Sequence, residues 1–320
     1  MFRLHTRIKS KTNHSKGAPM SLRHTLFAVS ALAASAALVA CHNDEFDPNA
    51  ETGSVPVGDT VVLTTGGKVS SFNRAPPSAL LGTRTVKGLA SGETLLAIDF
   101  RPAQSKIYAL SSQGNVYALD PATGQVSAKV GLTPNTMTPI NTACMPAVTQ
   151  FTALNGTEFG IDFNPSVDRL RIVSDTGQNL RVNVDNGMTT VDCPLMIGTT
   201  ASKTSAAAYT NSVPGRGVQT PTADATTLFY IDASTDQLLS TSAPNNGTLA
   251  VVGPLGVDVS AVNDFDTIAS LSGTTFTNTS FAVLTVGGTN SFYRIDLATG
   301  TATAVASFSS TGALRGLALK

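Results

Sequence analysis

The chain repeats one short unit of strand-like runs, and this repeat constrains its fold more than any other feature. Two stretches, LLAIDFRP (95–102) and FGIDFNP (159–165), align directly, and each precedes two further alternating runs joined by a short turn. The last of these runs ends at a turn that opens with aspartate. Aspartate there accepts a hydrogen bond from the backbone two residues on, and glycine in the turn supplies a positive φ. Each unit therefore predicts a four-stranded antiparallel meander.

The turn aspartates fix the length of the unit. They are 65, 47 and 64 residues apart, at Asp120, Asp185, Asp232 and Asp296. The aspartate of the opening run lies 21 residues before the turn aspartate in the first copy, from Asp99 to Asp120. In the second copy the spacing is 23 residues, from Asp162 to Asp185. The fourth copy is longer, and residues 270–280 are its predicted insertion.

A lone meander cannot bury both of its faces, so the units must stack face to face. Their length and strand number predict an all-β fold, a β-propeller of five four-stranded blades. Four blades begin at residues 95, 156, 205 and 262, and the fifth combines 60–65, 66–74 and 84–89 with the C-terminal 313–320 as its innermost strand. Pairing of the N- and C-terminal segments then closes the ring. A β-helix is the alternative fold, although its repeats are shorter and more regular.

The first 40 residues read as an export signal, with Met20 as the expected true start. An apolar run of 14 residues, 26–39, is too short to span a bilayer. It leads into Leu38-Val39-Ala40-Cys41, which resembles a bacterial lipobox. The resemblance implies that Cys41 becomes the acylated N-terminus and anchors the chain in a membrane. Ordinary signal cleavage beside an incidental cysteine is the alternative.

Residues 41–58 are acidic, contain two prolines and have few apolar groups, which predicts a flexible tether before a single domain at 59–320. In lipoprotein sorting, which this leader resembles, an aspartate directly after the acylated cysteine favours retention in the inner membrane. Here His42 occupies that position. We therefore expect a bacterial cell-envelope protein, attached to the outer membrane.

Composition excludes several classes of function. Six basic and no acidic residues lie in the first 40, so the remaining 280 carry 15 basic and 21 acidic residues, a net charge of −6. This argues against a nucleic-acid partner. His42 is the sole histidine after residue 40, so imidazole catalysis and histidine–zinc sites are excluded from the domain. The chain has no tryptophan and four glutamates, which leaves sugar stacking and paired-carboxylate hydrolysis poorly supplied.

Two stretches carry a family resemblance. Ala97–Leu110 matches the motif A-I-D-F-R-P-x-x-x-x-L-Y-A-L, and Asp168–Arg181 matches D-R-[IL]-R-[IV]-V-S-D-T-G-Q-N-L-R almost residue for residue. With these motifs, most of residues 59–320 resemble the bacterial domain-of-unknown-function family 4394. The resemblance implies an extracytoplasmic, propeller-like domain. The family has no assigned activity, so the resemblance adds no catalytic residue.

Arginines gather in the second unit. Arg169 and Arg171 share one face of a predicted strand, with Arg181 in the next run. As a binding site, the three arginines would form a cradle for an anionic ligand. As a structural feature, the buried arginines would pair with Asp162 and Asp168, and we favour this interpretation because buried charges are ordinarily paired.

Aspartates recur before phenylalanine in the predicted innermost strands, at Asp99, Asp162 and Asp264. Carboxylates around a central channel could hold Ca²⁺, which takes six to eight oxygen ligands. We favour hydrogen bonds from these carboxylates to backbone at the strand ends, because no calcium-loop motif is present. The expected cofactor is therefore none, with calcium as the alternative.

The turn at 174–179 is the first choice for a binding loop, because Asp175, Gln178 and Asn179 present carboxylate and amide groups. A purely structural turn is the favoured alternative. Residues 132–155 form the longest connection and are a second place where recognition could occur. In an oxidising compartment Cys144 and Cys193 could form a disulfide, with two buried thiols as the alternative.

No assembled nucleophile accompanies this scaffold, so the sequence favours a non-enzymatic binding or interaction module. Its expected partners are the membrane, through the acyl chains on Cys41, and an envelope protein or small molecule. The alternative is a hydrolase or lyase that works at the ring centre with aspartate and arginine.

Overall fold

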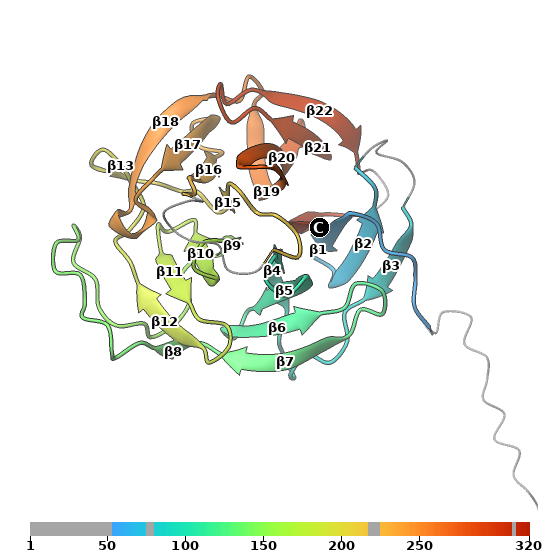
Figure 1. The fold of residues 1–320 in the computed structure, drawn as a ribbon, viewed down its shortest axis with the longest axis horizontal. Helices are drawn as coiled ribbons and strands as arrows, with labels where there is room; N and C mark the ends of the chain where they lie inside the picture. The colour runs from blue at the N-terminus through green and yellow to red at the C-terminus, as the bar shows by residue number, and fades with distance from the viewer. Residues whose placement is uncertain (1–52, 75–79, 217–224, 309–311) are drawn as a thin grey trace, which may run out of the picture. The chain divides into compact units, whose positions relative to one another are not determined.

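The domain is a five-bladed β-propeller, as the repeat predicts (Figure 1). A computed structural model of the chain describes residues 53–74, 80–216, 225–308 and 312–320. In these ranges five sheets of four to six strands surround a common axis. They contain one short 3-10 helix, Pro244–Asn246, and no α-helix, and hence no helix that is long and apolar enough to cross a bilayer. The predicted signal, Cys41 and most of the tether lie outside the described residues.

The first two blades follow the two units that align best. Blade 1 consists of β4 (Leu95–Arg101), β5 (Lys106–Ser111), β6 (Asn115–Leu119) and β7 (Val126–Gly131). Blade 2 consists of β9 (Phe159–Asn164), β10 (Arg169–Ser174), β11 (Asn179–Val182) and β12 (Met188–Val191), with the short β8 (Thr133–Pro134) added in parallel at its outer edge. The long connection 132–155 therefore begins as part of the blade 2 sheet.

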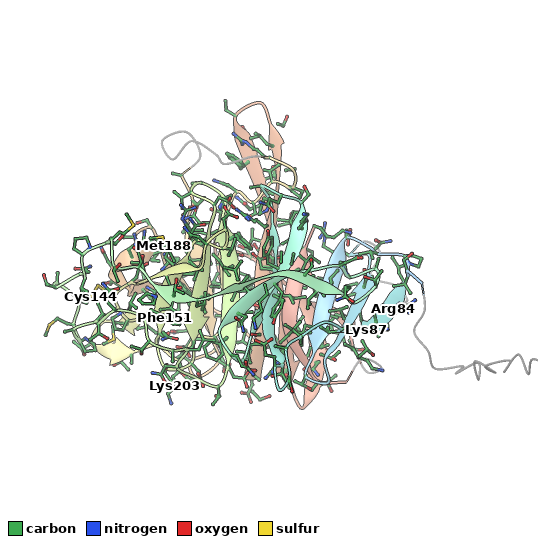
Figure 2. All side chains as sticks on the ribbon, turned by 90° about the horizontal axis from the view of Figure 1, so that it is seen from below. Arg84, Lys87, Cys144, Phe151, Met188 and Lys203 are labelled. Atoms are coloured by element: carbon green, nitrogen blue, oxygen red, sulfur yellow. A yellow bond between two sulfur atoms is a disulfide. The ribbon has the colours of Figure 1, made fainter. Side chains whose placement is uncertain are left out.

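The next two blades carry the insertions. Blade 3 consists of β15 (Ala207–Tyr209), β16 (Leu228–Asp232), β17 (Gln237–Thr241) and β18 (Thr248–Pro254), extended by β13 (Met196–Ile197) and β14 (Thr200–Ala201). Blade 4 consists of β19 (Val259–Ser272), β20 (Thr275–Val286), β21 (Thr289–Ile295) and β22 (Ala302–Ser307). The predicted insertion 270–280 lengthens β19 and β20 into a hairpin, which projects beyond the ring at the top of Figure 2.

Blade 5 joins the two ends of the domain. It consists of β1 (Thr60–Thr64), β2 (Lys68–Phe72), β3 (Gly82–Thr85) and β23 (Leu314–Leu319). β23 is the innermost strand and pairs antiparallel with β1, from Thr60 opposite Leu319 onward. The ring is thus closed as predicted, which excludes the β-helix. The outer strand was placed too late at 84–89, because β3 already ends at Thr85.

The core is divided among the blade boundaries. Five separate apolar clusters occur, and each combines side chains from two neighbouring blades. Ala97 and Ile98 are consecutive residues of β4, and they lie in different clusters, one toward blade 2 and one toward blade 5. Since successive side chains of a strand point to opposite faces, both faces of each blade must be apolar. This accounts for the near-continuous apolar runs in the inner strands.

The predicted turns form with one shift. Asp120, Asp232 and Asp296 each accept a hydrogen bond from the backbone N–H two residues on. Asp185 does not, because Asn183 takes this role and accepts from the N–H of Asp185. The turn therefore begins two residues earlier than predicted, and the Asp185 carboxylate is left available for a contact with another blade.

Candidate functional site

The central aspartates link each blade to the next one. Asp99 of β4 accepts the backbone N–H of Phe163 in blade 2 at 2.7 Å, and Asp162 of β9 accepts that of Tyr209 in blade 3 at 3.1 Å. The predicted bond to backbone is therefore present, and it crosses a blade boundary. The position that aspartate occupies in the innermost strands of blades 1 and 2 is held by Ala208 in blade 3 and by Gly316 in blade 5. These two strands therefore offer no such carboxylate.

Blade 4 has two aspartates in this position. Asp264 and Asp266 accept the backbone N–H groups of Leu317 and Leu319 at 2.9 and 2.7 Å, which fastens β19 to the closing strand β23. The ladder between β19 and β20 shifts register between Val262 and Asp264.

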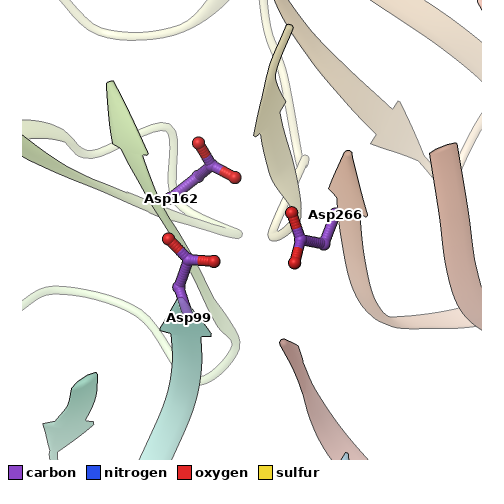
Figure 3. Close-up of side chains that lie close together, drawn as sticks. All are labelled: Asp99, Asp162 and Asp266. Atoms are coloured by element: carbon purple, nitrogen blue, oxygen red, sulfur yellow. The ribbon is translucent and has the colours of Figure 1, made fainter. Parts of the chain in front are cut away.

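Three of these carboxylates meet at the ring centre. One oxygen each from Asp99, Asp162 and Asp266 lies within 4.8 Å of the others (Figure 3). The sequence indicated Asp264 as the third member, and Asp266 takes that place. Sequence reasoning missed Asp266 because it precedes threonine and not phenylalanine. Such a triad could hold a cation, but its members are fully buried and each accepts a backbone hydrogen bond.

Burial changes the proton affinity of the cluster. Desolvation, reinforced by the neighbouring carboxylates, holds the pKa values of Asp99 and Asp162 well above their usual range. Burial also raises the pKa of Asp264, and it raises that of Asp266 to about 6. The centre of the ring therefore favours protonated carboxyl groups that accept backbone hydrogen bonds.

The buried arginine of β10 finds partners that the sequence did not indicate. Arg171 donates from Nη1 to Asp192 at 2.6 Å and to Asn179 at 2.7 Å, and from Nη2 to Asn245 in blade 3 at 2.9 Å. Asp162 and Asp168, the expected partners, are engaged elsewhere. Asp192 directly follows β12, two strands away from Arg171 in β10. The pair therefore cannot be inferred from residues that face each other on adjacent strands.

Asp168 pairs with an arginine of blade 1. Arg101 donates from Nε and Nη2 to the two oxygens of Asp168 at 2.8 and 2.5 Å, and from Nη1 to Asp185 at 2.9 Å. Its guanidinium lies 5.5 and 5.6 Å from the ring centroids of Tyr108 and Phe163. This clasp between blades 1 and 2 was missed, although Arg101 stands in the first aligned motif as a charge within a strand.

The turn 174–179 is occupied by structural bonds. Asp175 accepts the backbone N–H and the hydroxyl of Thr157, and Gln178 bonds to backbone of the preceding connection, at Ala153 and Asn155. Asn179 donates to the carbonyl oxygens of Cys193 and Pro244. A cavity of about 300 Å³ lies beside the turn, but these amide and carboxylate groups are already used to hold the loops. The geometry thus fits the structural alternative.

A disulfide fastens the same region. Cys144 and Cys193 are bonded across a sequence separation of 49 residues, with their Cα atoms 5.0 Å apart. The bridge ties the long connection to the loop that follows Asp192. Within this connection, Met137 and Met145 are 83% and 81% exposed.

The remaining predicted residues line a small polar cavity, which we call the arginine cavity. Its volume is about 260 Å³, and its polar lining consists of Arg169, Arg181, Asn183 and Thr190 of blade 2 with Asn135 and Thr138 of the long connection. Of the predicted cradle it contains Arg169 and Arg181, whereas Arg171 turns toward blade 3.

The two guanidinium groups of the arginine cavity differ in their pairing. Arg181 donates from Nε and Nη2 to Asp192, which leaves Nη1 without a partner among the described residues. Arg169 donates only from Nη1, to the carbonyl oxygens of Val167 and Asp168, and forms no ion pair within the described part of the chain. Arg169 therefore brings into the cavity a guanidinium that no described carboxylate contacts, although its charge, after the hydrogen bonds from Arg101, helps to lower the pKa of the Asp185 carboxyl.

Comparison with known proteins gives a family and no activity. Residues 68–318 match the family described as a domain of unknown function, DUF4394. The chain belongs to this family. The match supports the resemblance seen in the two sequence motifs. A search of curated proteins finds no match.

Solved structures resemble this DUF4394 chain only distantly. They include a nidogen/laminin complex (12% identity, TM-score 0.45, 83% of this chain and 98% of that chain), BBS1N in complex with ARL6DN (10%, 0.35, 80% and 66%), and dihydro-heme d1 dehydrogenase NirN (15%, 0.32, 82% and 46%). The chain thus spans less than two thirds of the length of the last two. At these TM-scores the matches carry no conclusion about activity or ligands.

Proposed function

We propose that this chain is an exported, lipid-anchored binding module of the bacterial cell envelope that is not an enzyme and takes a small anionic ligand in the arginine cavity. The observation that carries the proposal is the Arg169 guanidinium. It lies half-buried in a polar cavity, and its partners within the described chain are backbone carbonyl groups.

The chemistry of the cavity supports an anion. Guanidinium groups bind carboxylate and phosphate oxygens in pairs, and hydrogen bonds to charged groups are the strong ones. The hydroxyls of Thr138 and Thr190 accept the two amide N–H groups of Asn135 and can turn their own O–H groups toward a ligand as neutral donors. The cavity volume of about 260 Å³ lies just below the lower limit for typical ligand sites, about 300 Å³. It therefore suits one carboxylate, sulfate or phosphate group, with the rest of a larger ligand outside.

Calorimetric titration with sodium phosphate, sodium sulfate and citrate tests the site. We expect at least one anion to bind, with an affinity that falls as the salt concentration rises. Arg169→Gln should weaken binding about tenfold, since a charge-assisted hydrogen bond contributes about 1.5–3 kcal/mol. Arg294→Gln, which changes an exposed arginine of blade 4, is the matched control and should leave the affinity unchanged. Equal affinities of the two variants, or no binding of any of the three anions, would contradict the proposal.

Membrane attachment is tested separately through Cys41. The lipobox-like sequence at 38–41 supports acylation of this thiol. Expressed with its leader in a Gram-negative host, the wild-type chain should sediment with the outer membrane. Cys41→Ser should appear in the soluble fraction. Continued sedimentation of the variant with membranes would contradict lipid anchoring.

The alternative of a hydrolase or lyase at the ring centre has less support. Asp99 and Asp162 are only 3% and 2% exposed, and each accepts a backbone hydrogen bond that fixes its place between two blades. A catalytic carboxyl group must contact its substrate. The burial of these two residues therefore favours a structural role for the central aspartates, and the binding module remains the better proposal.

A further inference from the structure

A second hollow lies between blades 3 and 4, on other blades than the arginine cavity. It has a volume of about 750 Å³, and we call it the blade 3–4 groove. Its walls include Thr227 and Phe229 of blade 3 and Thr279, Arg294, Asp296 and Thr303 of blade 4. The volume falls within the range of about 300–1,000 Å³ that ligand sites occupy. It is large enough for a ligand of more than one ring.

One wall of the groove belongs to the base of the projecting hairpin of β19 and β20 (Figure 2). Residues 267–280 of this hairpin contain no charged side chain, and eight of the fourteen are serine or threonine. The wall therefore presents hydroxyl groups without an accompanying charge.

Several of the groove's polar groups have no protein partner. The side-chain hydroxyls of Thr227, Thr279 and Thr303 form no hydrogen bond within the described chain. The guanidinium of Arg294 likewise forms no ion pair or hydrogen bond to any described residue. These groups are donors and acceptors that a ligand can satisfy.

The charges in the groove balance. Arg294 and Asp296 are separated by one residue, so their side chains leave the strand on the same side, yet they do not pair with each other. Asp296 uses Oδ1 for its turn, as acceptor for Ala298 and Thr299, which leaves Oδ2 available. A groove with one guanidinium and one carboxylate does not favour an anion, unlike the arginine cavity.

The base of the groove is partly apolar and well fixed. Phe229 and Ile295 are buried, and both belong to the apolar cluster between blades 3 and 4. Asn278 and Asn211 exchange two hydrogen bonds across the same boundary, from the Asn211 backbone to Oδ1 and from Nδ2 to the Asn211 side chain. The two walls are therefore held in place before any ligand binds, which limits the entropy cost of binding.

We infer that the blade 3–4 groove binds a neutral, hydroxyl-rich ligand, an oligosaccharide of two or three rings. Threonine side chains pair a hydroxyl with a methyl group, and sugar rings likewise alternate hydroxyl groups with C–H faces. Arg294 would donate hydrogen bonds to sugar hydroxyls, and Asp296 would accept hydrogen bonds from them. This site is independent of the arginine cavity, so either can exist without the other.

Titration calorimetry with maltotriose and with tri-N-acetylchitotriose tests the inference on the exported domain. At least one of the two should bind with a Kd of about 1 mM or lower. The double variant Thr279→Val, Thr303→Val keeps the shape of both side chains and removes their hydroxyls, and it should bind at least about fivefold more weakly. Thr248→Val, at an exposed position of β18 in blade 3, is the matched control and should bind like the wild type.

Two further variants keep the outcome interpretable. Arg294→Gln alters an exposed side chain, so it tests the groove even if the double variant unfolds, and it should weaken the same saccharide at least about threefold. Arg169→Gln should leave saccharide binding unchanged, which separates this site from the arginine cavity. Absence of heat with both saccharides at about 10 mM overturns the inference. So does equal affinity of the wild type and a folded groove variant.

Discussion

The clasp between blades 1 and 2 gives the sharpest test of how the ring is held together. Arg101 is 1% exposed and joins both oxygens of Asp168, whose side chain is 14% exposed, whereas the Asp185 side chain is 61% exposed. Removing one partner of a buried ion pair costs about 3–5 kcal/mol, because the other charge stays behind without compensation. Solvent screens the exposed pair with Asp185, so that pair contributes less than about 1 kcal/mol.

We therefore expect Arg101→Gln to lower the free energy of unfolding by about 3 kcal/mol. For a domain of this size that is a fall of roughly 6–12 °C in Tm. Asp168→Asn should cost about 2 kcal/mol, since Arg101 keeps Asp185 as a partner. Asp168 has φ +51°, a left-handed conformation that asparagine also adopts, so this variant does not strain the backbone. Asp185→Asn should cost less than about 1 kcal/mol.

Differential scanning calorimetry and urea unfolding of the oxidised domain measure these values, with Arg294→Gln as the control for loss of a surface arginine. A double-mutant cycle of Arg101→Gln with Asp168→Asn should give a coupling of about 2 kcal/mol. If Arg101→Gln melts within about 2 °C of the Arg294→Gln control, the clasp does not stabilise the ring and the reasoning is refuted.

Three other predictions follow from the ring centre and the disulfide. Burial raises the pKa of Asp266 to about 6, so the folded state favours its protonated form; the contribution of this group to stability should be full below about pH 4 and fall by about 3 kcal/mol as the pH rises through 6. Unfolding of the wild type and of Asp266→Asn across this pH range measures that contribution as the difference between them, and the same pH dependence in both proteins would contradict the assignment. Calcium at about 5 mM should shift Tm by less than about 1 °C relative to a chelator, because calcium takes six to eight oxygens and the three central carboxyls are already bonded to backbone; a larger rise would establish a metal site. Replacing Cys144 and Cys193 together by serine should cost about 4 kcal/mol, the entropy of a 49-residue loop, and an unchanged Tm would show that the bridge constrains nothing in the unfolded chain.

Sequence reasoning recovered the architecture because the repeat is a local signal. The innermost strands begin at residues 95, 159, 207 and 259, close to the predicted blade starts of 95, 156, 205 and 262. The closing strand 313–320 was predicted from its apolar pattern and from the need to remove an exposed edge. Two elements were predicted at the wrong residues. β3 is a short strand that departs from the pattern of the other copies, and at Asp185 the turn is formed by Asn183 instead of an aspartate.

The candidate site was less accessible to the sequence. Arg169 and Arg181 could be proposed together because they lie in adjacent runs of one blade. Asp192 as the partner of Arg171, and Arg101 as the partner of Asp168, could not, because each pair joins residues whose separation in the chain follows no period. The blade 3–4 groove was missed altogether, since the threonines in its lining look like ordinary strand residues.

The sequence by itself determined the number of blades, the order of the strands and the closure of the ring, since strand alternation and turn chemistry act between neighbours along the chain. Tertiary structure alone decided which charges meet. Every blade buries both of its faces against other blades, so its buried charges must be paired inside the ring. Arg101 finds its partners in the next blade and Arg171 finds Asp192 beyond the outer strand of its own blade, and no local pattern of the sequence records how far these side chains reach.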